Sequence, residues 1–214
     1  MSPDDRYDVS GLTEAQFEPG SDVLVLKNLP GIKSPVEMDI AEASALVKAM
    51  DRFVRMYDEA HRFTASDICE FHRLWLGDIY AWAGEYRQVN VSKGDFPFAA
   101  AARVPALMAE FERDALVRCT PCNFTVHDEV VRALAETHVE LVLIHPFRDG
   151  NGRVARVLST LMALQAGLPL LDFSTIAAEK KEGYFAAVQA GLDRNYQPMK
   201  EIFAEVIERS VAES

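Results

Sequence analysis

Residues 144–156 read Ile144-His145-Pro146-Phe147-Arg148-Asp149-Gly150-Asn151-Gly152-Arg153-Val154-Ala155-Arg156. Before this stretch, apolar side chains recur at three- and four-residue steps from Val130 to Leu141, and the same period returns from Val154 to Met162. This spacing places the apolar side chains on one face of a helix. Pro146 opposes continuation of the first helix, because the residue before a proline is pushed out of the α region. The stretch therefore predicts a helix, a tight loop and a second helix.

Helical periods also cover most of the remaining chain, over residues 39–57, 64–80, from about residue 100 onward and over 202–207. Residues 84–98 break this rhythm: Val89 to Ser92 alternates apolar and polar as a strand does, and Lys93-Gly94-Asp95 offers a turn. We expect an all-α domain over residues 38–214 with a short β-hairpin flap at about 88–98. Residues 1–37, rich in Pro and Gly, are expected to form an extension packed on this core.

The overall charge limits which classes of molecule the chain is expected to bind. The chain of 214 residues carries 22 basic and 33 acidic side chains, a net charge of −11. Because a nucleic acid favours a basic footprint, this acidic balance argues against a nucleic-acid binder. Hydrophobic residues make up 49% of the chain, which is enough apolar material for a folded core and argues against disorder.

Three cysteines are too few and odd in number for a disulfide framework. The acidic N-terminus shows no secretory signal, and no apolar run is long enough to span a membrane. We therefore expect a cytoplasmic protein with no membrane partner. The pair Cys119 and Cys122 lacks a second pair to complete a zinc site, so it is interpreted as incidental, and His138 is interpreted as a core histidine.

The loop in the opening stretch has the composition of an anion site. Gly150 and Gly152 free the backbone and allow a ligand to approach closely. The loop also presents unpaired N–H groups and the positive end of a helix dipole. Arg153 and Arg156 follow one turn apart, so both guanidinium groups can reach phosphate oxygens on one side.

Two further side chains add chemistry to this loop. Asp149 is a hard oxygen ligand that suits Mg²⁺ carried by a nucleotide. His145 ends the preceding helix and is placed as a general base. Each feature alone is common in structural turns and helix ends. Their conjunction within twelve positions favours a triphosphate cradle with a metal ligand and a base.

The same twelve residues resemble the signature of the Fic (Fic/Doc, or Fido) family, His-x-Phe-x-Asp/Glu-Gly-Asn-Gly-Arg-x-x-Arg, and every position from His145 to Arg156 matches it. Residues 26–32, Leu-Lys-Asn-Leu-Pro-Gly-Ile, are similar to the family's entry segment. Residues 78–87, Asp-Ile-Tyr-Ala-Trp-Ala-Gly-Glu-Tyr-Arg, are similar to its Ile-Tyr-x-Trp-Ala-Gly-x-x-Arg stretch. The resemblance thus extends over most of the chain.

The resemblance implies a Fic-type helical core and transfer of AMP from ATP to a Ser, Thr or Tyr hydroxyl of a target protein, with release of pyrophosphate. In this interpretation His145 is the catalytic base, Asp149 holds Mg²⁺, and Phe147 anchors the loop in the core. The nucleotide-binding residues that it implies are Arg148, Gly150, Asn151, Gly152, Arg153 and Arg156. The intact Gly-Asn-Gly-Arg sequence favours AMP transfer over the kinase variant of the family.

The flap is expected to dock the target. An extended backbone there can pair with a segment of the target by β-augmentation and hold the acceptor hydroxyl over His145. The expected docking residues are Val91, Ser92, Lys93, Gly94, Asp95 and Phe96. A plain surface hairpin is the alternative interpretation of the same segment.

Many Fic proteins are inhibited by a helix with Ser/Thr-x-x-x-Glu followed by Gly or Asn. The spacing occurs at Ser10/Glu14, Ser66/Glu70, Thr125/Glu129 and Thr175/Glu179, but no Gly or Asn follows in any of them. We therefore expect any inhibition to come in trans from a small antitoxin-like protein. Two alternatives stay open: the toxin component of a toxin–antitoxin pair, and a Fic enzyme that transfers another nucleotide or phosphocholine.

Overall fold

The computed structural model describes residues 11–174 and 181–213. The spacings Ser10/Glu14 and Thr175/Glu179 therefore fall partly or wholly outside the described residues. Helices α5 (His127–Ile144) and α6 (Asn151–Gln165) form the centre of the fold and pack against each other. Within the described ranges, no helix is both long and apolar enough to cross a membrane.

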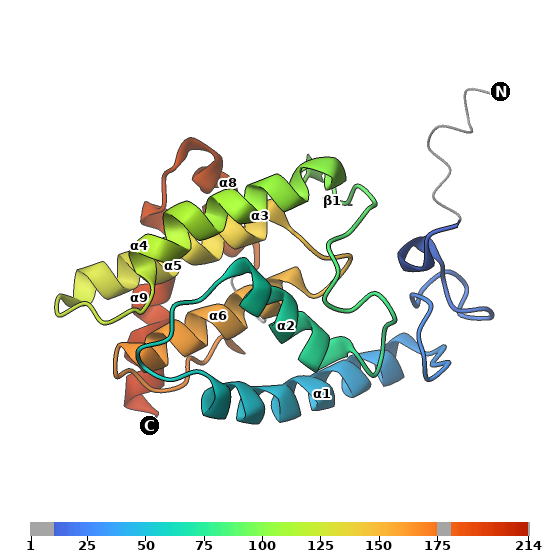
Figure 1. Cartoon of the computed structure of the whole chain (residues 1–214), viewed down its shortest axis with the longest axis horizontal. Helices are drawn as coiled ribbons and strands as arrows, with labels where there is room; N and C mark the ends of the chain where they lie inside the picture. Colours follow the sequence, from blue (N-terminus) through green and yellow to red (C-terminus); the bar gives the residue numbers. More distant parts are fainter. Residues whose placement is uncertain (1–10, 175–180, 214) are drawn as a thin grey trace.

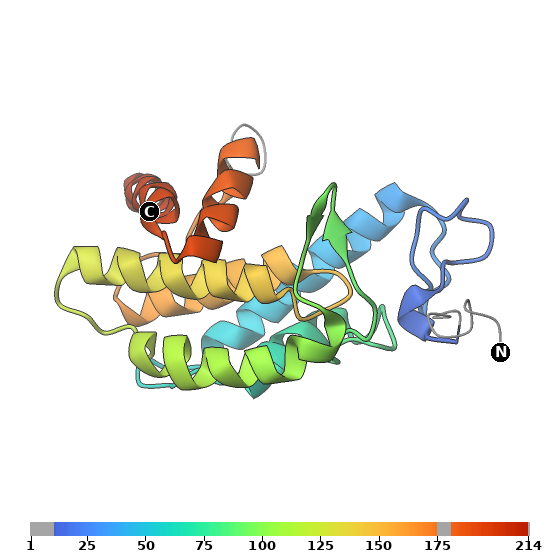
Figure 2. The same cartoon turned by 90° about the horizontal axis from the view of Figure 1, so that it is seen from above.

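The other helices cover this central pair (Figure 1). Helices α1 (Pro35–Met56) and α2 (Ala65–Leu76) pack on each other and on α6, whereas α3 (Val104–Phe111) packs on α5. Helices α8 (Lys181–Ala190) and α9 (Gln197–Ala212) lie together on another side of α5 (Figure 2). Short helical turns complete the chain: η2 (Thr13–Ala15), η3 (Ala101–Arg103), α4 (Val117–Cys119) and η5 (Gly191–Asp193). The helical fold class expected from the sequence is confirmed.

Local capping explains where the first two helices begin. Helix α1 starts four residues before the expected Asp39, because Ser34 caps it by accepting a hydrogen bond from the Glu37 N–H and Pro35 occupies its first position. Proline is favourable there, since its fixed φ suits a helix and the missing N–H has no partner to lose. Helix α2 begins after Thr64, which caps it by accepting a hydrogen bond from the Asp67 N–H.

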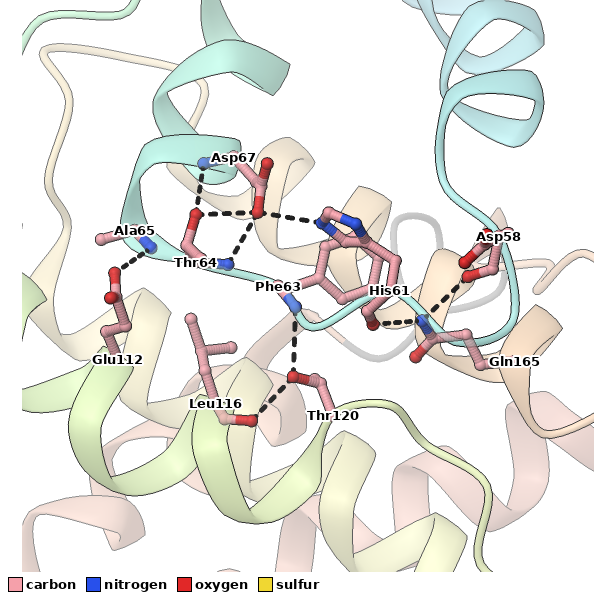
Figure 3. A network of polar contacts seen from close by, with 10 residues as sticks. All are labelled: Asp58, His61, Phe63, Thr64, Ala65, Asp67, Glu112, Leu116, Thr120 and Gln165. Carbon is pink, nitrogen blue, oxygen red and sulfur yellow. Dashed lines mark hydrogen bonds and ion pairs between the residues drawn. The ribbon is translucent and has the colours of Figure 1, made fainter.

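A polar network fixes the start of α2 against its neighbours (Figure 3). Thr64 and Asp67 form a reciprocal capping box, and the same Asp67 carboxylate lies 3.1 Å from His61 Nε2. The N–H of Ala65 donates to Glu112 at 2.7 Å. Because Glu112 opens a π-helical turn, η4 (Glu112–Leu116), α2 is tied directly to the α3–α4 segment. The π turn interrupts a region for which the sequence predicts only continuous helix.

The flap is a minimal hairpin that stands out from the helical body (Figure 2). Strand β1 (Ser92–Lys93) pairs antiparallel with β2 (Phe96–Pro97) around a two-residue turn. The strand is shorter than the alternation from Val89 suggests. The Val89 carbonyl instead accepts a hydrogen bond from the Arg87 side chain at 2.8 Å. This carbonyl therefore pairs with a side chain and not with a neighbouring strand.

Residues 11–33 contain little regular structure but contact the core at defined points. The Leu29 N–H donates to the Ile79 carbonyl at 2.8 Å, and the Gln88 N–H donates to the Glu14 carboxylate at 2.6 Å. Asn28 closes its own loop, because its side chain both accepts from the Ile32 N–H and donates to the Ile32 carbonyl. This segment thus reaches the base of the flap.

His138 is a core histidine, as interpreted from the sequence. Cys119 and Cys122 are buried and Cys69 is half-buried, and all three are free thiols. His138 is buried between the Ser159 hydroxyl at 3.1 Å and the Tyr184 hydroxyl at 2.9 Å. Its pKa is lowered to about 3, chiefly by burial, so it is a neutral core histidine.

Candidate active site

His145 lies just past the end of α5 in a left-handed conformation, with φ 53° and ψ 60°. Its ring Nδ1 is 3.0 Å from the Val142 carbonyl oxygen. Because a carbonyl oxygen can only accept, Nδ1 carries the proton and Nε2 is left as the basic nitrogen. The local backbone therefore selects the tautomer that a general base needs.

Burial keeps this histidine neutral. The ring of Phe98 stacks on the His145 ring with centroids 3.6 Å apart and an angle of 15° between the planes. Burial is the main cause that lowers the pKa of His145 to about 4, and the positive charge of Arg87 acts in the same direction. The imidazole is consequently deprotonated at neutral pH. Phe98, which was not among the predicted site residues, is the flap residue closest to this ring.

The loop after His145 is held from within. Phe147 is fully buried, as the resemblance implies for an anchor. The Asn151 side chain accepts from the Phe147 N–H at 2.8 Å and donates to the Phe147 carbonyl at 2.9 Å. Its amide is thus occupied, so Asn151 can offer a ligand its backbone N–H. The backbone N–H groups of Asn151 and Gly152 both lie in the first turn of α6, where N–H groups have no hydrogen-bond partner within the helix.

Helix α2 forms a floor under this loop. His72 Nε2 is 3.2 Å from the Asp149 carbonyl, and His72 Nδ1 accepts a hydrogen bond from the Gly84 N–H at 2.8 Å. Its ring stacks on Phe147 at 4.0 Å. Gly150 adopts φ +80°, and a Cβ added there would lie 2.7 Å from the Trp75 ring. Only glycine fits between the floor and the loop.

Arg153 is engaged by a buried carboxylate that the sequence analysis did not single out. Glu42 of α1, with a side chain 4% exposed, contacts Arg153 Nη1 at 2.5 Å and accepts from the Tyr80 hydroxyl at 2.7 Å. The guanidinium lies over the Trp75 ring, 4.6 Å from its centroid, and 3.6 Å from the Asp149 carboxylate. These contacts fix Arg153 on three sides.

Arg156 has different surroundings from Arg153. It is half-buried, and no carboxylate of the described residues forms an ion pair with it. Burial and the positive charge of Arg153 lower its pKa, while the nearby Tyr184 acts in the opposite direction. A guanidinium so placed favours an anionic ligand.

These side chains meet in one cavity of about 400 Å³. The predicted residues that line it are His145, Arg148, Asp149, Gly150, Asn151, Gly152, Arg153, Arg156, Val91, Ser92 and Lys93. Gly94, Asp95 and Phe96, at and after the turn of the flap, are not part of the lining. Three lining residues were missed, Val142, Tyr184 and Phe185, and Phe98 also lines the cavity. The Lys93 ammonium lies 3.8 Å from the centre of the Phe185 ring, so the flap and α8 approach each other above the cavity.

Arg148 and Asp149 occupy the rim of this cavity. The Arg148 Nε donates to the Glu14 carbonyl at 2.9 Å, which ties the loop to the N-terminal segment. The Asp149 side chain is 50% exposed, and its carboxylate accepts from the Gly150 N–H at 2.5 Å. No group of three or more metal-ligating side chains occurs in the described ranges. A single exposed carboxylate does fit Mg²⁺ that is bound mainly by nucleotide phosphates and water.

The fold is helical, and its cavity brings together the start of α6, two arginines and a neutral histidine. The model of the Fic/DOC family matches residues 62–163. A relative from Salmonella typhimurium, "Probable protein adenylyltransferase Fic", is 31% identical over 144 residues, which are 65% of this chain and 68% of the relative. This chain therefore belongs to the Fic/DOC family.

Other relatives differ in length. The "Protein adenylyltransferase VbhT" of Bartonella schoenbuchensis is 25% identical over 194 residues, or 88% of this chain, but the match covers 37% of the relative. The chain spans 29% of the "Protein adenylyltransferase fic-1" of Caenorhabditis briggsae. Among solved structures, BepC from Bartonella tribocorum with bound AMPPNP has a TM-score of 0.70 and 26% identity, covering 86% of this chain and 92% of BepC.

Proposed function

We propose that this chain is a protein adenylyltransferase that transfers AMP from ATP to a Ser, Thr or Tyr hydroxyl of a target protein. One observation carries the proposal: the open Nε2 of a neutral histidine and the first turn of α6 face the same cavity. The names of the relatives and the nucleotide bound to BepC support ATP as the substrate.

In this reaction His145 Nε2 removes the proton of the acceptor hydroxyl. The hydroxyl oxygen then attacks the α-phosphorus, a new P–O bond forms, and the bond to the oxygen that bridges the α- and β-phosphorus breaks. Pyrophosphate leaves with the electron pair of that bond. Because positioning and charge stabilisation supply most of the rate in phosphoryl transfer, the fixed loop is central to the proposal.

The phosphates would be bound by the loop and the two arginines. The N–H groups of Asn151 and Gly152 point from the helix start, Arg156 supplies a guanidinium without a carboxylate partner among the described residues, and Arg153 keeps free donors besides those used by Glu42. Asp149 would hold Mg²⁺, which supplies charge neutralisation on the phosphates. Arg148 adds positive charge at the rim.

The flap would present the target. Ser92 and Lys93 are exposed strand residues beside the cavity, so an extended target segment can add to this edge by backbone pairing. Gly94, Asp95 and Phe96 would then contact the target outside the cavity rather than the nucleotide. Three free thiols and an ATP substrate support the cytoplasm as the place of the reaction.

Incubation with ATP labelled at the α-phosphate and a host lysate tests the proposal. We expect the wild-type chain to label at least one protein, and His145→Ala to lose label by roughly 10²–10⁴-fold while retaining ATP binding. ATP labelled at the γ-phosphate should give no label. Undiminished labelling by His145→Ala would overturn the role of His145, and a mass increase other than that of AMP would favour another transferred group.

We also propose that inhibition comes in trans from a small protein with an acidic helix. An apolar groove of about 670 Å³ runs between α1 and α6 and reaches Arg153 and Arg156. Its walls include Leu46, Val54 and Val157. An amphipathic helix in this groove could place a glutamate on Arg156. A synthetic helix carrying Ser-x-x-x-Glu-Gly should inhibit the wild type, and Val54→Glu in the groove should relieve that inhibition. Equal inhibition of both would contradict docking in the groove.

A further inference from the structure

Arg87, between α2 and the flap, is 2% exposed. No carboxylate of the described residues forms an ion pair with it. Its guanidinium donates instead to backbone carbonyls, which satisfy the donors that burial removes from water. Burial lowers the pKa of Arg87, and the Glu14 carboxylate acts in the opposite direction. Its hydrogen-bond partners are main-chain oxygens, so they show which segments Arg87 holds together.

One set of partners is the end of α5. Arg87 Nε donates to the His145 carbonyl at 2.6 Å, Nη2 lies 3.4 Å from the Ile144 carbonyl, and the Arg87 N–H donates to the Pro146 carbonyl at 2.9 Å. The last carbonyls of a helix lack partners within the helix and carry partial negative charge. Arg87 thus caps α5 from a distant part of the chain.

The cap falls on a strained residue. A left-handed conformation is unfavourable for a non-glycine residue, because Cβ approaches the following carbonyl oxygen, and His145 adopts it with φ 53°. Such conformations persist where the surroundings over-determine them. The hydrogen bonds from Arg87 flank the strained residue on both sides, at Ile144 and Pro146, and also include its own carbonyl.

The second set of partners is the flap. Arg87 Nη1 donates to the Val89 carbonyl at 2.8 Å, and Nη2 donates to the Ala99 carbonyl at 2.5 Å. Val89 precedes β1 and Ala99 follows β2, so the two bonds hold both ends of the hairpin. Phe98, the neighbour of Ala99, stacks on the His145 ring.

We propose that Arg87 is a positioning residue that fixes the flap and the backbone of His145 in one relative geometry. Arg87 is not among the residues that line the cavity. It sets the distance between the edge that would hold the acceptor hydroxyl and the nitrogen that would take its proton. This inference rests on the proposed adenylyl transfer for its kinetic consequence, whereas its structural part is independent of that activity.

Two variants test the role. Arg87→Met removes the donors, and Arg87→Lys keeps the charge but supplies a compact ammonium that cannot reach both flap ends and the helix end together. We expect kcat for target labelling to fall by on the order of 10²-fold in Arg87→Met and less in Arg87→Lys. KM for the target should rise, while ATP-induced thermal stabilisation should change little, because the phosphate contacts lie elsewhere.

Arg118→Met is the matched control. Arg118 pairs with Asp114 at 2.9 Å and Glu136 at 2.5 Å, outside the cavity. It should lower the midpoint of thermal unfolding without changing kcat or either KM. If Arg87→Lys and Arg87→Met lowered only stability, as Arg118→Met does, Arg87 would be a structural residue and the proposal would be wrong.

Amide hydrogen exchange separates this proposal from the proposed function. Exchange in residues 89–99 and 144–146 should rise in Arg87→Lys relative to wild type, and Arg118→Met should leave it unchanged. If the wild type labelled no target but exchange in Arg87→Lys rose as expected, adenylyl transfer would be refuted, and the positioning of the flap and His145 by Arg87 would still be supported. Unchanged exchange in both segments would overturn the positioning role of Arg87, whether or not the chain labels a target.

Discussion

The floor of the cavity and its flap are built in opposite ways. Beneath the loop, His72, Trp75 and Phe147 are all buried and contact one another or the loop. The flap, in contrast, has two strands of two residues each, and Ser92 and Lys93 are exposed. The proposed phosphate site needs fixed donors, whereas the proposed docking surface for protein segments needs an open edge. The two halves of the site therefore have different tolerance to change.

The sharpest test of this contrast uses two glycines that both have positive φ. A Cβ at Gly150, in the loop that rests on the floor, would lie 2.7 Å from the Trp75 ring. At Gly94 in the flap, an added Cβ would have nothing within 4 Å. Gly150→Ala should lower the free energy of unfolding by about 4 kcal/mol, the sum of strain and overpacking, and abolish labelling. Gly94→Ala should cost about 1 kcal/mol. Urea unfolding measures both, and equal costs would break the comparison.

Acid should destabilise the folded chain through its buried histidines, one of which belongs to the floor. Burial lowers the pKa of His72 to about 4, and those of His138 and His145 to about 3 and about 4. The unfolded chain binds these protons near pH 6.5, so stability is full above pH 6.5 and falls as pH drops toward 4. We expect a loss of about 3 kcal/mol between pH 7 and 5.5, measured by urea unfolding at each pH. A flat profile would mean that these histidines are solvated.

Glu42→Gln tests the part of the floor contributed by α1. The amide keeps a hydrogen-bond acceptor for Tyr80 but removes the charge facing Arg153. Since a half-buried guanidinium then lacks its partner, we expect the free energy of unfolding to fall by about 2 kcal/mol and KM for ATP to rise. Glu37→Gln on the exposed first turn of the same helix is the control and should change neither. If KM for ATP did not change, Arg153 would not be a phosphate-binding residue.

The smallest effect on stability is expected from the flap. Phe98→Ala removes the ring that stacks on His145, so water reaches the imidazole and its pKa rises from about 4 toward 6.5. The acid limb of the pH profile of kcat/KM should move to higher pH. Phe96 lies two residues before Phe98 and outside the cavity lining. Phe96→Ala should therefore leave that limb in place. An unmoved limb in Phe98→Ala would show that another group buries the base.

The sequence predicts well what local patterns decide. The period of apolar residues located the helices on either side of the loop. The N-cap of α2 could be narrowed to Thr64 or Ser66, because capping chemistry lies within three residues, and the structure selects Thr64. The twelve-residue motif located the loop. Helix α1 was placed too late because Pro35 was interpreted as a break rather than as a first helical residue.

The contacts that hold the site could not be predicted in this way. Glu42, Arg87 and Glu14 lie 111, 58 and 134 residues from their partners in the 145–153 segment. No periodicity links residues so far apart. Glu14 and Glu42 look like ordinary surface charges in sequence, and the family-like stretch that ends at Arg87 does not reveal what Arg87 contacts. Burial of Glu42 and Arg87 is the signal that reveals them, and burial is known only once the helices are packed.

The cavity also has an order of assembly. Its floor comes from residues 42–87 and its loop from 145–156, while Tyr184 and Phe185 of α8 form its far wall. Synthesis releases the N-terminal part of a chain first. A nascent chain can therefore place His145 over a finished floor while the cavity still lacks a wall. Only after α8 leaves the ribosome are both sides of the cavity present, so the cavity cannot form in full before Phe185 has been made.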